Sequence, residues 1–227
     1  QNPVIKYKLK KEEQKQLLMI TLAAQLRIAL LEEKQESAEE LVKLIEEELL
    51  SIDFCSPYRG DVYLQLAAFY HLAEENNMGM NLTKKALIDY QDLGLSEKKA
   101  HAYIELSAIM LAEEKIKDAH DYLILSLRLF PERFRFPHNK LQLLVCTGIC
   151  YYLQGNISKS LQLSIEALTL AQEAGKRDWE LLSLFFAGRI YFDLGLHENA
   201  QTHFLKGLTL ISMYTIKNAR KVLMAWL

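Results

Sequence analysis

The chain has 227 residues, of which 50% are hydrophobic and 25% are charged, with a formal net charge of −2 and a sequence pI near 6.4. This near-neutral balance argues against nucleic acid as a direct partner and against attraction to a membrane surface. No run of eighteen uninterrupted apolar residues occurs, so membrane insertion is not expected. Four prolines and nine glycines among many Leu, Ala, Glu and Lys residues indicate an all-α protein.

The cysteines indicate the cellular compartment of the protein, and the two ends of the chain indicate whether it is part of a longer protein. Three cysteines occur, and Cys146 and Cys150 lie four apart in an apolar helical run, so buried thiols are expected rather than a disulfide framework or a metal pair. A reducing, cytoplasmic location follows. The chain begins with glutamine, shows no signal peptide and stops inside a helical pattern. We therefore expect a fragment of a longer protein.

In chain order, apolar residues with three-four spacing predict a series of helix pairs. Residues 6–34 form the first predicted helix, and Ser37 with Glu40 fits a capping box that opens a second helix through Leu50. Four more pairs follow, separated by loops rich in Pro and Gly, and the last residues begin another helix. The expected units are residues 6–51, 60–95, 100–132, 141–175 and 181–213, with a partial helix at 216–227.

The strongest signal is the period of these units. A small residue recurs in the first helix of each of the last four, at Ala67, Ser107, Gly148 and Gly188, with spacings of 40, 41 and 40 residues. Self-similarity at this period, with two helices per period, indicates a solenoid in which each pair covers the apolar face of its neighbour. We expect one domain over residues 1–227: an all-α, right-handed α-solenoid of antiparallel helix pairs.

The residues resemble the tetratricopeptide repeat (TPR) family. That family combines a small residue and Tyr on the first helix, a turn glycine, then Ala, an aromatic and Ala-Leu on the second. The resemblance is carried by three sets of residues: Gly148-Tyr151-Gly155-Ala167-Leu168, Gly188-Tyr191-Gly195-Ala200-Phe204 and Ser107-Ala119-Pro131. Glu74 and Glu114 depart from it at the turn glycine, and Met110 replaces the tyrosine. The long period is similar to that of kinesin light chains and of the sensor domains of maltose-regulator-type activators.

The resemblance implies a concave groove lined by the first helices. Phe185, Phe186, Arg189 and Phe192 are the strongest candidates, because aromatic and arginine side chains on a face that packing does not require are typical binding hot spots. Arg189 is the best single candidate, whereas Phe185 and Phe192 could alternatively cover the sixth helix. Carried over residue by residue, the other groove positions are Gln65, His71, His101, Glu105, Gln142, Cys146 and Tyr152.

No catalytic or metal-binding pattern is present. The sequence lacks a Gly-rich phosphate loop, an H-E-x-x-H motif, a C-x-x-C pair and a nucleophile elbow, so no enzyme activity, cofactor or metal is expected. A basic patch surrounds the connection after the third unit, and it fits either a solvated loop or a contact with an acidic peptide or phosphate. Its members are Arg128, Arg133, Arg135, His138 and Lys140.

Three functional hypotheses remain open. The first is a non-enzymatic scaffold that binds a protein or peptide in the groove, within a larger multi-domain or multi-subunit protein. The second is a regulatory domain that senses a small molecule or short signal peptide and controls an attached effector, such as a transcription activator. The third is self-association through exposed apolar ends of the array.

Overall fold

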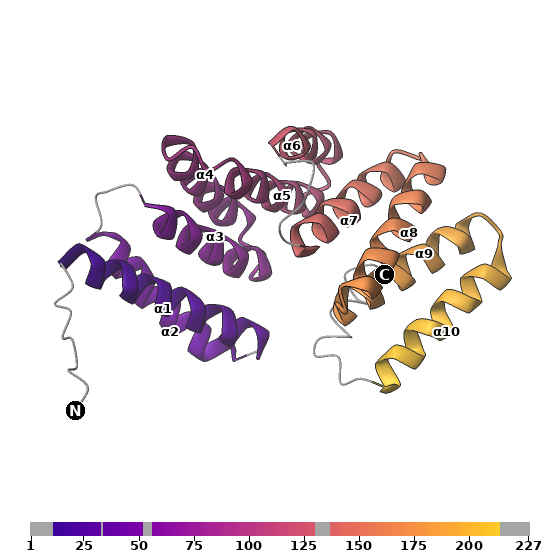
Figure 1. Cartoon of the computed structure of the whole chain (residues 1–227), viewed down its shortest axis with the longest axis horizontal. Coiled ribbons are helices and arrows are strands. Elements are labelled where there is room, and N and C mark those ends of the chain that lie inside the picture. The colour runs from indigo at the N-terminus through magenta and orange to yellow at the C-terminus, as the bar shows by residue number, and fades with distance from the viewer. Residues whose placement is uncertain (1–10, 33, 52–55, 130–136, 214–227) are drawn as a thin grey trace, which may run out of the picture. The chain divides into compact units, whose positions relative to one another are not determined.

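The computed structural model describes residues 11–32, 34–51, 56–129 and 137–213, and this part of the chain is helical without strands (Figure 1). The ten helices of this part form five consecutive pairs joined by short turns. Their bounds are α1 Lys11–Leu31, α2 Gln35–Leu49, α3 Pro57–Leu72, α4 Asn76–Asp92, α5 Ser96–Ala112, α6 Ile116–Leu129, α7 Pro137–Leu153, α8 Ile157–Glu173, α9 Arg177–Asp193 and α10 His197–Met213. The all-α prediction is confirmed.

The chain divides into two compact units, residues 1–102 (unit 1) and 103–227 (unit 2). In unit 1, α1 packs on α2 and on α3, and α3 packs on α4. In unit 2, α7 packs on α6 and α8, and α9 packs on α8 and α10. The first helix of each pair is α1, α3, α5, α7 or α9. That all five pairs form a single domain stays a prediction.

The turns between paired helices share one backbone conformation. Glu74, Glu114, Gly155 and Gly195 have φ values of 63°, 58°, 77° and 72°, at spacings of 40, 41 and 40 residues. At each turn the next residue donates its backbone N–H to a carbonyl five residues back, as Asn156 does to Tyr151 O at 2.8 Å. This is a Schellman motif, whose left-handed residue is usually glycine. The two glutamates therefore occupy positions where a side chain is strained.

Unit 1 buries a core between its first three helices. Met19, Leu26 and Ile45 are at most 2% exposed, and Leu66 of α3 packs against the same cluster. At the start of α3, Ser56 accepts the backbone N–H of Arg59 at 3.0 Å and Pro57 stands at the first helical position. A serine cap followed by proline fixes the start of this helix.

Unit 2 packs its helices by placing aromatic rings against glycines. A Cβ atom at Gly188 would lie 2.6 Å from Phe204 Cε1, and one at Gly207 would lie 2.5 Å from Phe185 Cε2. Gly148 faces Phe186 in the same way, with 3.3 Å between a Cβ and the ring. Small residues at close helix crossings, as the sequence predicts, let these rings approach the neighbouring backbone.

Some predicted boundaries are wrong. The second to fifth units begin at residues 57, 96, 137 and 177, three or four residues before the expected starts. Ser37 does not cap α2, because this helix already begins at Gln35 with Lys34 as its N-cap and no side-chain cap. The predicted helix over residues 216–227 and the first residues of the predicted opening helix lie outside the described residues.

Candidate functional site

Within unit 2, side chains of neighbouring first helices contact one another at the predicted groove positions. Gln142 on α7 donates from Nε2 to Glu105 Oε1 on α5 at 2.8 Å. Further along α7, the Tyr152 hydroxyl donates to Asp193 Oδ2 at the end of α9, and the Tyr152 ring packs edge-on against Phe186 with 5.9 Å between centroids. The predicted residues Glu105, Gln142, Tyr152 and Phe186 therefore form contacts between successive pairs.

Arg189 lies at the solvent side of this row and is paired. Its Nε is 3.2 Å from both carboxylate oxygens of Asp193, one turn along α9. The same carboxylate accepts the hydroxyl of Tyr152, so two side chains, one from α9 and one from α7, converge on it. The hydrogen bond to Asp193 raises the pKa of Arg189, and burial, with the hydrogen bond to Asp193, raises the pKa of Tyr152. At neutral pH the tyrosine is neutral and the arginine–aspartate pair is charged.

Two of the predicted hot-spot aromatics belong to the packing. Phe186 is 4% exposed and lies in the core cluster with Leu141 and Ile190. Phe185 is half-buried, with its ring 5.6 Å from that of Phe204. The expectation that packing does not require these side chains is wrong, because each fills the space left by a glycine, Gly148 for Phe186 and Gly207 for Phe185.

Phe192 differs from the other two phenylalanines. Its side chain is 55% exposed, and its ring meets His197 of the following helix edge-on at 5.4 Å between centroids. Whether Phe192 covers a sixth helix concerns residues outside the described part. Among the described residues, Phe192 is the large aromatic side chain that the candidate row presents to solvent beside Arg189.

Cys146, by contrast, is 8% exposed, and burial, with a smaller contribution from Glu105, raises the pKa of its thiol to about 12. Burial also raises the pKa of Cys150 to about 11. Both thiols are buried, as the sequence predicts, and burial keeps them protonated at neutral pH. Among the described residues, no group of three or more His, Cys, Asp and Glu side chains is placed to hold a metal ion.

The other three predicted groove residues lie in unit 1. Gln65, His71 and His101 are each half-buried. The ring of His71 shares a hydrogen bond of 2.8 Å between its Nδ1 and Asn76 Oδ1 across the turn to α4.

The basic patch is only partly visible. Arg128 is exposed at the end of α6, and Lys140 Nζ pairs with Glu166 Oε1 at 3.2 Å on α8. Arg133, Arg135 and the side chain of His138 fall outside the described residues. Lys140 therefore forms an ion pair between α7 and α8. The basic patch as a binding site stays a hypothesis.

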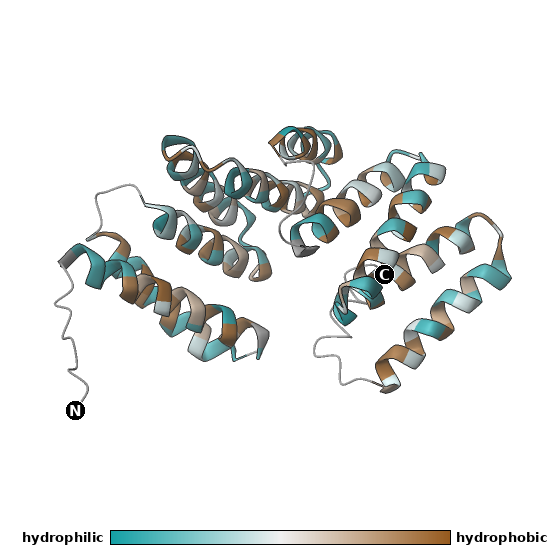
Figure 2. Cartoon of the chain, viewed as in Figure 1, coloured by the Kyte–Doolittle hydropathy of each residue, from teal (hydrophilic) through white to brown (hydrophobic). Residues whose placement is uncertain are grey.

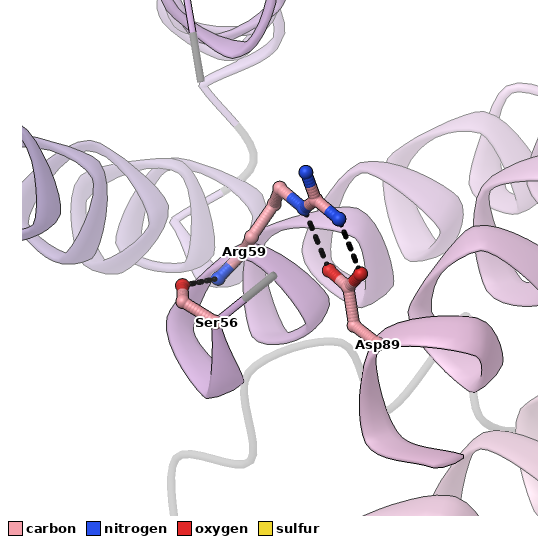
Figure 3. A network of polar contacts seen from close by, with 3 residues as sticks. All are labelled: Ser56, Arg59 and Asp89. Carbon is pink, nitrogen blue, oxygen red and sulfur yellow. Dashed lines mark hydrogen bonds and ion pairs between the residues drawn. The ribbon is translucent and has the colours of Figure 1, made fainter. Parts of the chain in front are cut away.

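The sequence reasoning missed a buried ion pair in unit 1 (Figure 3). Arg59 Nε donates to Asp89 Oδ2 at 2.8 Å and Nη2 donates to Oδ1 at 2.5 Å, so the two side chains form a bidentate pair between α3 and α4. The side chains are 16% and 1% exposed. The available signal was an aspartate on the apolar face of α4 between Ala86 and Tyr90, because such a charge requires a partner.

Next to it, Tyr90 lies over Gly60, where a Cβ would be 2.5 Å from the ring. Its hydroxyl donates to Asp61 Oδ1 at 2.7 Å, and Lys98 at the start of α5 donates to the other oxygen of Asp61. Burial, then Asp61, raises the pKa of Tyr90. These contacts connect α3, α4 and the start of α5, and they have no feature of a ligand site.

The family and structure comparisons agree with this geometry. The tetratricopeptide repeat model matches residues 140–211. No curated protein matches the sequence. Residues 140–211 therefore match tetratricopeptide repeats, and the fold of the chain is similar to that of TPR-like helical repeat structures.

Three solved structures illustrate the likeness. The Rap conjugation gene regulator of plasmid pLS20, in complex with the Phr* peptide, aligns with a TM-score of 0.74 at 13% identity over 97% of this chain and 60% of that one. A putative kinesin light chain from Podospora anserina gives a TM-score of 0.59 at 15% identity over 86% and 97%. A signal transduction ATPase of the STAND class from Pyrococcus horikoshii, with a tetratricopeptide repeat sensor, gives 0.66 at 22% identity over 93% and 33%.

At these identities the likeness concerns the fold alone. The chain spans about a third of the STAND protein and 60% of the Rap regulator, whose remaining parts have no counterpart in the alignment. The part of the chain that the structure describes contains no helix both long and apolar enough to cross a bilayer.

Proposed function

We propose that the chain is a non-enzymatic module that binds a protein or peptide partner on the first helices of unit 2, within a larger multi-domain or multi-subunit protein. The observation that carries this is the exposed ring of Phe192 beside the Arg189–Asp193–Tyr152 cluster at the ends of α7 and α9. A large aromatic side chain next to an ordered arginine is the residue combination that dominates binding energy at protein interfaces.

Two features support a peptide as the partner. The cluster is held on rigid helices by contacts between successive pairs, so it is preorganised and binding would cost little ordering. The fold is shared with the Rap regulator whose structure contains the Phr* peptide. Catalysis is not part of this proposal, and the thiols of Cys146 and Cys150 are buried with raised pKa values. Free buried thiols also favour a cytoplasmic location.

A sensing role is the alternative within the same framework. The likeness to a STAND protein with a tetratricopeptide repeat sensor favours it, since there the matched segment is part of a chain with an ATPase. In that case the binding face would hold a short signal peptide or a small molecule, and binding would control an effector. Both roles require the same face, so one experiment tests their shared premise.

The test is selection from a phage library of random peptides on the purified chain. Three baits are compared: the unmodified chain, the double variant Arg189→Ala/Phe192→Ala, and the control Leu205→Ala/Lys206→Ala. The control removes an equally exposed apolar and cationic pair from α10, since Leu205 is 54% exposed and Phe192 55%. Circular dichroism melting first confirms that all three are folded.

We expect peptides that are enriched by the unmodified chain and by the control but not by the Arg189/Phe192 variant. Equal enrichment on all three baits would show that Arg189 and Phe192 do not belong to the binding face. A library that yields no enriched peptide on any bait would contradict peptide binding by this chain.

A further inference from the structure

Charged side chains are few in two stretches of the candidate face of unit 2. From Leu141 to Leu153, α7 contains no Asp, Glu, Lys or Arg, and from Leu181 to Leu196 the only two are Arg189 and Asp193. Beyond its teal first turn, α7 is mostly brown to pale in Figure 2. The second helices of the same pairs keep charges at Lys159, Glu166, Glu173, Glu198 and Lys206. The uncharged character is therefore limited to these two stretches, because α9 begins with Arg177, Asp178 and Glu180, and α5 carries Glu105.

The two charges on this face neutralise each other. Arg189 Nε contacts both oxygens of Asp193 at 3.2 Å, and the same carboxylate accepts the hydroxyl of Tyr152. Asp193 is 30% exposed on its side chain and has three hydrogen bonds from these neighbours. A charged group of a partner would meet a pair of zero net charge, and it would lose hydration for little electrostatic gain.

Large apolar side chains are exposed where α7 and α9 end. Phe192 is 55% exposed, Leu153 and Leu196 are each 48% exposed, and Leu194 is 46% exposed. We call these four residues the apolar edge. Tyr152 joins the ends of the two helices through its contacts with Asp193 and Phe186, so the members of the apolar edge belong to adjacent helix ends.

We infer, resting on the proposed function, that the partner of this face is an uncharged peptide segment with large apolar or aromatic side chains, which pack on the apolar edge. Apolar burial then supplies the affinity, and the Arg189–Asp193 pair stays intact in the complex as a polar border. Interactions of this kind are insensitive to ionic strength, whereas recognition of an acidic or basic peptide weakens steeply with salt.

The test uses the peptides enriched by phage selection on the full chain, synthesised with a fluorophore and measured by anisotropy. We expect sequences rich in Leu, Ile, Phe, Trp or Tyr, without a charge bias. Their Kd should change by less than about twofold between about 50 and 500 mM NaCl. Phe192→Ala should weaken binding by about tenfold or more, and Phe192→Leu should keep most of the affinity.

Asp193→Asn provides a second, independent readout. This variant leaves Arg189 without its counter-charge, so acidic peptides that the unmodified chain ignores should now bind, and their affinity should fall with salt. If Asp193→Asn does not change selectivity for acidic peptides, the pair does not set the partner class.

The outcomes separate this inference from the proposed function. Enriched peptides that are lost in Phe192→Ala, yet are acidic or basic and lose about tenfold in affinity at high salt, would overturn the inference and keep the function. Peptides that bind Phe192→Ala as well as the unmodified chain would overturn both. Dimerisation that Phe192→Ala abolishes, with no peptide captured, would identify a second copy as the occupant and also overturn both.

Discussion

Unit 1 and unit 2 build the same kind of helix pair but join their helices with different chemistry. Unit 1 uses polar contacts: the buried Arg59–Asp89 pair, the Tyr90–Asp61 hydrogen bond and a Tyr70–Glu46 hydrogen bond of 2.7 Å between α3 and α2. Unit 2 places rings on Gly148, Gly188 and Gly207, as unit 1 does with Tyr90 on Gly60, and its α7 carries no charged residue from Leu141 to Leu153. The tetratricopeptide repeat model matches within unit 2, where the packing follows the small-and-aromatic pattern of the family.

The comparison shows that similar helix pairs can be held together by polar contacts or by aromatic rings packed on glycines. It also shows which helix ends expose apolar side chains that a partner could contact. In unit 2 glycine and aromatic contacts pack the helices, and the ends of α7 and α9 expose the apolar side chains of Leu153, Phe192 and Leu194. In unit 1, where the Arg59–Asp89 pair and its neighbours join the helices, the end of α3 also exposes an apolar side chain, Leu72 at 65%.

The largest expected effect comes from breaking the polar connection in unit 1. Arg59→Ala should lower the free energy of unfolding by about 3–5 kcal/mol, because it leaves the carboxylate of Asp89 buried without a counter-charge. Urea denaturation followed by circular dichroism measures the loss. The matched control Arg59→Met/Asp89→Leu removes both charges and should recover most of the stability. A loss below about 1 kcal/mol would mean that the pair behaves as a surface salt bridge.

Gly188→Leu tests the glycine and aromatic packing of unit 2. The new side chain would clash with Phe204, whose Cε1 lies 2.6 Å from a Cβ at this position. We expect a destabilisation of about 1–3 kcal/mol or more from overpacking. Thermal melting gives the readout, and Phe204→Leu in a Gly188→Ala background should restore part of the stability by making space. An unchanged melting temperature in Gly188→Leu would contradict the assigned helix crossing.

The turns allow a smaller, stabilising test. Glu114 has a φ of 58° at the turn position that Gly155 occupies in the next pair with a φ of 77°. Glu114→Gly should therefore gain about 1 kcal/mol by relieving left-handed backbone strain, and Gly155→Glu should lose a similar amount. Both variants are compared by chemical denaturation under the same conditions. Destabilisation by Glu114→Gly would show that the glutamate side chain stabilises its turn.

The smallest effect at neutral pH concerns Tyr70. Burial, with the hydrogen bond to Glu46 and the charges of Glu46 and Glu75, raises the pKa of Tyr70 to about 12. The folded state therefore holds this proton more tightly than the unfolded chain, whose tyrosine pKa is about 10. Its contribution to stability is complete below pH 10 and is lost as the pH rises towards 12. Tyr70→Phe should flatten the decline of stability over that range, and an unchanged slope would contradict the coupling.

The repeat period and the helix pairs could be read from the sequence because they depend on local periodicity and on small residues at fixed spacing. The starts of the helices were placed too late, since first turns such as Ser96–Lys99 carry polar side chains that resemble a loop. Ser37 and Glu40 have the spacing of a capping box, but α2 begins earlier, at Gln35, so Ser37 lies inside the helix.

The candidate site was predicted only in part. Arg189 and Phe192 are exposed as expected. Phe185 and Phe186 were misjudged because their partners, Gly207 and Gly148, belong to other helices, and an aromatic at a groove position looks the same in sequence whether it faces solvent or a glycine. Asp193, which holds Arg189 and Tyr152, lies at a helix end where an aspartate has no sequence signature of its own.

The most direct measurement of the central claim is an NMR titration of the isotope-labelled chain with an enriched apolar peptide. The account predicts that the resonances that move most belong to the ends of α7 and α9, at Tyr152, Leu153, Arg189 and Phe192, while those of α1 to α4 stay unchanged. Shifts confined to unit 1 or to the outer face of α10 would contradict a binding face on the first helices of unit 2.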